Sequence, residues 1–384
     1  MTKDAILACT NIPLAKLPFR YLGVPISSKR LGVLDCAVLV EKVVHRIRAL
    51  GARKRSYGGR LVLVQFVLRN LYNYWARIFI LPKGILKKID DICRNYLWQG
   101  SEHYEKVPPV AWAKVCQSKA QGGLGLVLNE VWNIAAIGKY VWWLASKKDH
   151  LWVKWVNSVY IKGCDWWTYA PCSGASSSWK KICWVRDRLK SGFESYGWAS
   201  TGYSIRGGYL WLVPAQPKAP WVPLVWSRIS MQKHCFTFWL AVQQRLLTRD
   251  RLIRRGMCID GRCLLCAVAD ESHEHIFFAC DYSKRCLELL SRWLQVPIPW
   301  QSVVQWWLTC RVKPLLRKQI LGAAIGVLFY QIWQARNTSL HEMKLMVPSF
   351  IMKQVKFIIC KRLSYVVSSQ MQEKHASMIR GIMS

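Results

Sequence analysis

The sequence CLLCAVADESHEHIFFAC, residues 263–280, gathers three cysteines and two histidines in a short segment. Two residues separate Cys263 from Cys266, and eight more precede His275. Four residues then separate His275 from Cys280. A CxxC turn can point two thiolates at one metal ion, and a histidine and cysteine at the start of a helix can complete a tetrahedron. Three thiolates and one imidazole at this spacing predict a closed, structural Zn²⁺ site.

Neighbouring residues leave alternatives for the ligand set, namely Cys258, Cys286 and His273. If residues 272–280 begin a helix, His273 and His275 cannot both face one metal ion. We prefer His275, because it precedes the apolar residues 276–278, which can anchor its backbone in a small core. The competing interpretations are reduced, buried cysteines and a redox-active CxxC. Two leucines fill this turn, whereas a redox motif normally has Gly or Pro there at the start of a helix.

The charge of the chain is strongly one-sided. Its 384 residues include 56 Lys and Arg against 21 Asp and Glu, a net charge of +35. Such an excess of positive charge is self-repulsive, and a polyanion such as nucleic acid would neutralise it. An anionic membrane surface, or a basic surface without a partner, would be the alternatives. Hydrophobic residues make up 52% of the chain, which excludes general disorder.

Cysteine usage bears on the compartment. There are 15 cysteines, an odd number, and the N-terminal residues do not resemble a secretory signal. We therefore expect a reducing compartment, the nucleus or the cytoplasm, and no secretion. The longest apolar window, Ile320–Trp333, contains Gln331 and is shorter than the roughly 18–20 residues that a bilayer requires. It predicts a buried helix and no association with a membrane.

Two clusters of basic residues are the predicted nucleic-acid contacts. Lysines and arginines grip phosphates and specify little sequence. The alternative for each cluster is a solvated helix face, and most of the 22 tryptophans are expected in the core rather than as base-stacking platforms. The predicted contacts are Arg46, Arg48, Arg53, Lys54, Arg55 and Arg60 in the first cluster, and Arg249, Arg251, Arg254 and Arg255 in the second.

Hydrophobic periodicity predicts a mainly α fold with a minor β component. Apolar residues at helical spacing predict helices over residues 35–50, 60–79, 85–98, 132–145 and 233–252, and further helices towards the C-terminus. Residues up to about 34 are expected to be extended or looped. Trp, Gly, Ser and Pro crowd residues 151–225, where we expect short elements, a few strands among them, and no long helix.

Motifs along the chain carry a family resemblance. Around the cysteine segment they are WLA (239–241), LTRDRL (247–252) and ES (271–272). Upstream they are LPFRYLGVP (17–25), YGGR (57–60), YLWQG (96–100), VAW (110–112) and GGLGL (122–126). In this order, over roughly residues 14–295, they resemble the C-terminal part of plant LINE-type, non-LTR retrotransposon reverse transcriptases, including the reverse transcriptase zinc-binding domain. IWQARN (332–337) is similar to a segment often found downstream.

The resemblance implies four segments. They are a thumb-like, post-palm helical region over 1–150, a Trp-rich connector over 151–230, the zinc-binding domain over 231–300 and a helical C-terminal tail over 301–384. The thumb-like region would hold a primer–template duplex by its phosphates. Structural Zn²⁺ is the implied cofactor and the RNA or DNA backbone the implied partner, and no small-molecule substrate is expected.

The sequence departs from the family where catalysis is concerned. Family members polymerise with a pair of aspartates that binds two metal ions, on a hairpin preceding the YLGVP segment. The pair found here, Asp90-Asp91, lies inside a predicted amphipathic helix. A ribonuclease H site needs three or four carboxylates, and residues 311–384 contain only Glu342 and Glu373. We therefore predict no enzyme activity. The alternatives to a nucleic-acid-binding role are a zinc-stabilised protein-interaction module and a retrotransposon remnant without function.

Overall fold

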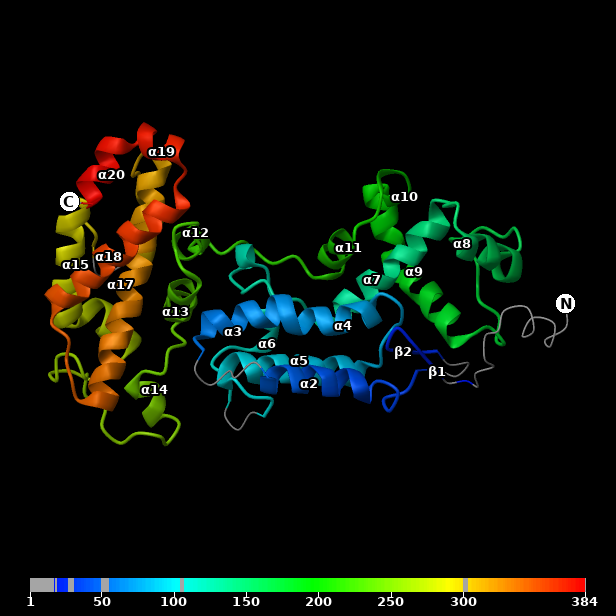
Figure 1. Ribbon diagram of the computed structural model, residues 1–384, viewed down its shortest axis with the longest axis horizontal. Helices are drawn as coiled ribbons and strands as arrows, with labels where there is room; N and C mark the ends of the chain where they lie inside the picture. Colours follow the sequence, from blue (N-terminus) through cyan, green and yellow to red (C-terminus); the bar gives the residue numbers. More distant parts are fainter. Residues whose placement is uncertain are drawn as a thin grey trace. The chain divides into compact units, whose positions relative to one another are not determined.

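The structure is a computed structural model that describes residues 17, 19–26, 31–49, 55–103, 107–299 and 303–383. The chain divides into two compact units, both built mainly from helices (Figure 1). Unit 1 comprises Met1–Lys54, Val62–Tyr104 and Val127–Ala215, and unit 2 comprises Arg55–Leu61, Glu105–Leu126 and Gln216–Ser384. The predicted mainly α fold with minor β is confirmed, and the four segment boundaries predicted from the sequence stay predictions.

Unit 1 combines one short hairpin with helices. Its elements are β1 (Phe19–Tyr21), β2 (Val24–Ile26), α2 (Ala37–Ala49), the π-helix η2 (Val64–Leu68), α4 (Arg69–Ala76), α5 (Lys83–Gln99), α7 (Asn129–Ala145), α8 (Leu151–Val156), the π-helix η4 (Asn157–Ile161), α9 (Ser177–Tyr196), α10 (Trp198–Thr201) and α11 (Ile205–Leu212). Strands β1 and β2 pair antiparallel, with Tyr21 opposite Val24 across the turn at Leu22-Gly23.

The core of unit 1 forms where α7 packs against α9 and α11. The approach is close at Gly138, where an added Cβ would lie 2.4 Å from the Tyr203 hydroxyl and 2.6 Å from Leu189 Cδ1. Asn133 ties α7 to the end of α4, because its amide donates to the carbonyls of Ala76 and Phe79 at 2.7 Å each. These contacts hold α9 with one face in the core and the other at the surface.

Unit 2 holds the remaining helices. They are α6 (Trp112–Val115), the 3₁₀-helix η3 (Lys119–Gln121), α12 (Val222–Val225), α13 (Gln232–Val242), α14 (Arg249–Ile253), the π-helix η5 (His275–Ala279), α15 (Asp281–Leu294), α16 (Val303–Thr309), α17 (Leu315–Glu342), α18 (Pro348–Val366), α19 (Ser369–Lys374) and α20 (Ala376–Met383). Helix α3 (Tyr57–Leu63) begins in unit 2 and ends in unit 1.

Helix α17 is the central helix of unit 2, against which α12, α13, α15 and α18 pack. It is long and apolar enough to cross a membrane by length and composition, yet 67% of its most apolar window is buried within the structure. The predicted buried helix over 320–333 is confirmed, while the absence of membrane association stays a prediction. Gly326 permits a close approach, because an added Cβ would lie 3.3 Å from the Phe238 ring.

Three expectations about helices are corrected by the structure. Residues 151–225 contain no strand and do contain a long helix, α9, of 20 residues. The helix expected from Arg60 begins earlier, at Tyr57, and includes the π-helical turn η2. The helix expected over 233–252 is two helices, α13 and α14. It breaks because Gln244 adopts a left-handed conformation with φ of 53°.

Candidate metal centre

The first two cysteines lie on a tight hairpin formed by residues 261–271. An antiparallel bridge joins Arg262 and Asp270, and the Cys263 N–H donates to the Ala269 carbonyl at 2.7 Å. The turn closes at Ala267, which adopts a left-handed φ of 58° and donates its N–H to the Cys263 carbonyl at 2.8 Å. This folding brings the Cys263 and Cys266 side chains to the same side of the loop.

The other two candidate ligands are His275, the first residue of the π-helix η5, and Cys280, which follows its last residue. The Ser272 hydroxyl accepts a hydrogen bond from the His275 N–H at 3.0 Å and so caps the start of this turn. The wide π-helical turn closes where the Cys280 N–H donates to the His275 carbonyl at 2.7 Å. Cys280 then serves as the N-cap residue of α15, directly before Asp281. A helix N-terminus favours negative charge, which suits a thiolate at this position.

The structure brings Cys263, Cys266, His275 and Cys280 together, with one ligand atom of each lying within 4.8 Å of the others. Cys266 Sγ and His275 Nε2 are 3.2 Å apart. In a tetrahedral site with Zn–S near 2.3 Å and Zn–N near 2.0–2.1 Å, neighbouring ligand atoms lie about 3.5–3.8 Å apart. Side-chain adjustments of about 1 Å would therefore fit the cluster to Zn²⁺, and three sulfurs with one nitrogen are a set typical of structural zinc.

The protonation of the cluster follows from its hydrogen bonds and burial. A hydrogen bond from the Cys263 thiol lowers the pKa of Cys280, and the N–H groups of Ser283 and Tyr282 lower it further. The same Cys263–Cys280 bond, together with burial, raises the pKa of Cys263. Burial lowers the pKa of His275, which favours the neutral imidazole that can bind a metal ion. Cys280 is thus better prepared than Cys263 to lose its proton.

The alternative ligands lie outside the cluster and have other roles. His273 is buried, and its Nε2 accepts the Leu246 N–H at 3.0 Å while Nδ1 lies 3.3 Å from the Thr248 hydroxyl. Burial lowers the pKa of His273 to about 4, so the ring is neutral. Cys258 donates to the Asp260 carbonyl at 3.1 Å, and Cys286 is buried within α15. His273 thus braces the turn after α13 instead of joining the four clustered ligands.

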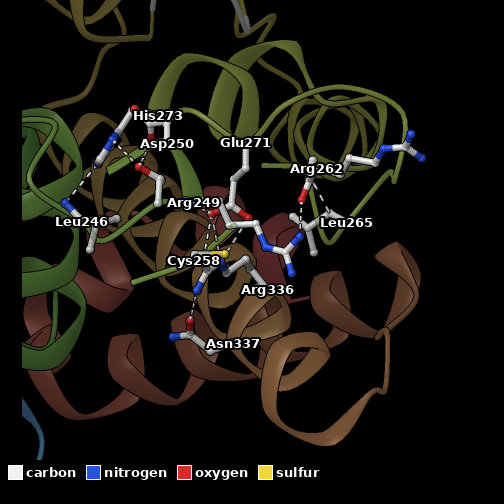
Figure 2. Close-up of polar contacts among 12 residues, drawn as sticks. Leu246, Arg249, Asp250, Cys258, Arg262, Leu265, Glu271, His273, Arg336 and Asn337 are labelled. Atoms are coloured by element: carbon white, nitrogen blue, oxygen red, sulfur yellow. Dashed lines mark hydrogen bonds and ion pairs between the residues drawn. The ribbon is translucent and has the colours of Figure 1, made fainter. Parts of the chain in front are cut away.

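A buried ion pair ties the cysteine hairpin to α17, and Figure 2 shows Arg336 reaching Glu271. Arg336 Nη2 lies 2.8 Å from Glu271 Oε1, and its Nε lies 3.1 Å from both carboxylate oxygens. The side chains are only 3% and 0% exposed. The Arg249 N–H also donates to Glu271 at 2.9 Å. The cysteine hairpin is therefore held against the core of unit 2.

Sequence inspection did not identify this pair or the role of His273. Glu271 lies in one of the resembling motifs and Arg336 in another, but nothing in the sequence links two positions 65 residues apart. His273 lies among the polar residues 270–275, and nothing in that segment indicates that its ring is buried.

The first predicted basic cluster is split between the two units. Arg46 and Arg48 are exposed on α2 in unit 1, and Arg48 pairs with Glu102 at 2.7 Å. Arg53 and Lys54 lie outside the described residues. Arg55 is exposed at the start of unit 2.

Arg60 belongs to the same cluster but is buried, with its guanidinium 5.4 Å from the Tyr57 ring centroid. Its burial leaves little of the side chain for a phosphate.

The second basic cluster divides by exposure. Arg249 is mostly buried and pairs with Asp260 at 2.6 Å. Arg251 is half-buried and donates to the Gln244 carbonyl. Arg254 and Arg255 are exposed, and Arg254 pairs with Asp250 at 2.5 Å. Arg254 and Arg255 are therefore the members with most surface available.

The aspartate pair of the sequence lies in the middle of α5. Asp90 accepts a hydrogen bond from the Asn129 amide at 3.0 Å, and Asp91 pairs with Arg94 at 2.8 Å. Both carboxylates are thus engaged by neighbouring side chains on helices.

Comparison with known proteins points to the same region. A family model described as zinc-binding in reverse transcriptase matches residues 203–286. A protein of Arabidopsis thaliana that is provisionally named a ribonuclease H protein is 30% identical over 179 residues. That match covers 45% of this chain and 28% of the relative, so the chain spans well under half of this relative's length.

A second relative is an uncharacterized mitochondrial protein of Arabidopsis thaliana. It is 27% identical over 120 residues, which cover 31% of this chain and 78% of the relative. The match to the family model includes Cys263, Cys266, His275 and Cys280, the four residues that the structure brings together. Residues 203–286 of this chain therefore resemble the zinc-binding region of reverse transcriptases.

Proposed function

We propose that this chain binds one structural Zn²⁺ ion and uses its basic surface to bind the phosphate backbone of RNA or DNA, as part of a reverse transcriptase. The observation that carries the proposal is the closed cluster of Cys263, Cys266, His275 and Cys280 in a region matching the family described as zinc-binding in reverse transcriptase. Four protein ligands complete the tetrahedral coordination of a zinc ion and leave no position for a substrate. The ion would therefore stabilise the fold and would not take part in a reaction.

Charge supports the nucleic-acid part of the proposal. The net charge of +35 favours a polyanionic partner. Arg46 and Arg255 are exposed and have no ion-pair partner among the described residues. Cations of this kind would bind phosphates without reading sequence, which suits a protein that must move along its template. We infer no small-molecule substrate and no membrane partner.

We further infer that this chain has no polymerase activity of its own. Asp90 and Asp91 lie within α5. Asp90 accepts a hydrogen bond from Asn129 and Asp91 forms an ion pair with Arg94, whereas a polymerase needs its carboxylates free to bind two metal ions. Thiolate ligands require a reducing compartment, which favours the nucleus or the cytoplasm.

The zinc part is tested by measuring bound metal on the purified full chain. We expect one Zn²⁺ per chain, and loss of the metal in Cys280→Ser, because no other described cysteine is placed to replace it. Cys258→Ser is the matched control and should retain the ion, since Cys258 lies outside the cluster. A wild-type chain that takes up no Zn²⁺, or a Cys280→Ser variant that retains it, would contradict the assignment.

The nucleic-acid part is tested by a salt titration of binding to RNA and DNA. Each neutralised phosphate releases counterions, so log affinity should fall linearly with log salt. The combined variant Arg46→Glu and Arg255→Glu should reduce that slope by about 0.9 per lost phosphate contact on a duplex. Binding that ignores salt would favour the protein-interaction alternative, and no binding at low salt would refute the nucleic-acid role.

A further inference from the structure

One surface of α9 in unit 1 carries an exposed tryptophan between two cations. Trp184 is 38% exposed, although Trp179 on the same helix is buried. Lys181 Nζ lies 5.7 Å and the Arg188 guanidinium 5.0 Å from the Trp184 ring centroid. Neither cation has an ion-pair partner among the described residues. Both cations lie over the Trp184 ring, and the exposed part of this side chain is flanked by positive charge that no carboxylate pairs with among the described residues.

A cavity of about 230 Å³ opens beside this tryptophan, within the same unit. Trp184, Lys181 and Ser177 line one side, and apolar residues such as Ile78, Leu86 and Ile134 line the other. Its volume is below the roughly 300–1,000 Å³ of pockets that hold drug-sized molecules. A single planar ring system that carries a few polar atoms would fit a cavity of this volume.

The carboxylate that lines this cavity should not repel a bound anion. Glu130 lines the cavity and is paired with Lys83 at 2.7 Å. Its charge is thus balanced locally, and Lys181 and Arg188 determine the charge at the tryptophan.

We propose that Trp184 and this cavity form a binding site for single-stranded nucleic acid. An unpaired base stacks on the Trp184 ring as Lys181 and Arg188 turn from the ring to the flanking phosphates, or the base enters the cavity. A duplex would hide the faces of its bases, and an apolar protein side chain would leave the two cations without counter-charge. This site rests on the proposed function and makes it more specific, because it assigns the binding of the unpaired strand to unit 1.

The test compares single-stranded and duplex oligonucleotides of matched sequence with the full chain at one salt concentration. Trp184→Ala should weaken single-strand binding about 5- to 150-fold and leave duplex binding unchanged, because each base–aromatic stack contributes about 1–3 kcal/mol. Its salt slope should stay at the wild-type value, because no phosphate contact is lost. Arg188→Ala should reduce that slope. Trp184→Phe keeps a flat ring and should restore much of the affinity.

Trp155 provides the matched control, because it is 49% exposed on α8 of the same unit and lines no part of the cavity. Trp155→Ala should leave both affinities unchanged. Equal weakening for both oligonucleotides in Trp184→Ala, or no effect on either, would overturn the site while leaving the proposed function standing. If the wild-type chain binds neither oligonucleotide, the proposed function itself fails.

Discussion

Replacing Arg336 by Met tests whether the Glu271–Arg336 pair holds the metal cluster in place. In the native structure the Glu271 carboxylate accepts hydrogen bonds from Nε and Nη2 of Arg336 and from the Arg249 N–H. Arg336→Met leaves only the Arg249 bond, and the carboxylate remains fully buried. Removing one partner of a buried ion pair costs about 3–5 kcal/mol, because the remaining charge has no compensation.

Chemical denaturation of the zinc-loaded chain, followed by a probe of unit 2, measures this loss. Arg254→Met is the matched control, because it removes an arginine whose side chain is 72% exposed and paired with Asp250 one helical turn away. Such a surface pair is worth only about 0.3–0.5 kcal/mol. Zinc retention against a competing chelator should fall with Arg336→Met and stay unchanged with Arg254→Met.

A double substitution separates the charge from the packing. Glu271→Met together with Arg336→Met removes both charges, so it should be less destabilised than Arg336→Met alone. A loss below about 1 kcal/mol in Arg336→Met, or a double variant as unstable as the sum of the single ones, would refute the reasoning.

Two further predictions concern the buried residues His234 and Gly138. Burial, with Lys233 and Arg362 nearby, lowers the pKa of His234 to about 3. The unfolded chain takes up this proton below about pH 6.5 while the folded chain does not, so unfolding free energy should fall as pH drops from 6.5 towards 3. His234→Phe should flatten that slope in acid denaturation, and an unchanged slope would refute the assignment. Gly138→Ala should lower unit 1 stability by about 1–3 kcal/mol, because its Cβ would overlap Tyr203 and Leu189. Gly84→Ala in α5 meets no atom within 4 Å and should be neutral or slightly stabilising by calorimetry.

The helices that the sequence predicted well are those with a clear apolar face. Helix α5 follows the predicted range 85–98 closely, because its buried residues recur every three or four positions. Helix α7 follows the predicted range 132–145 as well, although residues 133–138 are all buried. Helix α9 has an apolar face like that of α5, with Trp179, Cys183, Leu189 and Phe193 buried, and it was missed because Trp, Gly and Ser dominate its surroundings. Its end signals were present in the sequence as the N-cap Ser176 and a left-handed Gly197.

The proximity of the four candidate ligands was predictable from the sequence because these residues are local, and their spacing reflects one turn and one helix start. The choice between His273 and His275 depended on which ring nitrogens were already bonded, and that follows from contacts with Leu246 and Thr248. The predicted basic clusters were less informative. The sequence shows where the arginines lie, but not which of them form ion pairs with carboxylates, as Arg249 does with Asp260.

The distance along the chain between Glu271 and Arg336 has a consequence for synthesis. The four ligands are complete at Cys280, but Arg336 follows 56 residues later. At about 5–20 residues per second, the nascent chain passes roughly 3–11 s with its ligands made and Glu271 without its cation. In that interval a bound ion would be the main constraint on the hairpin, because α17 has not yet been completed. We therefore expect the yield of folded protein to depend on metal supply during translation more than on metal added afterwards.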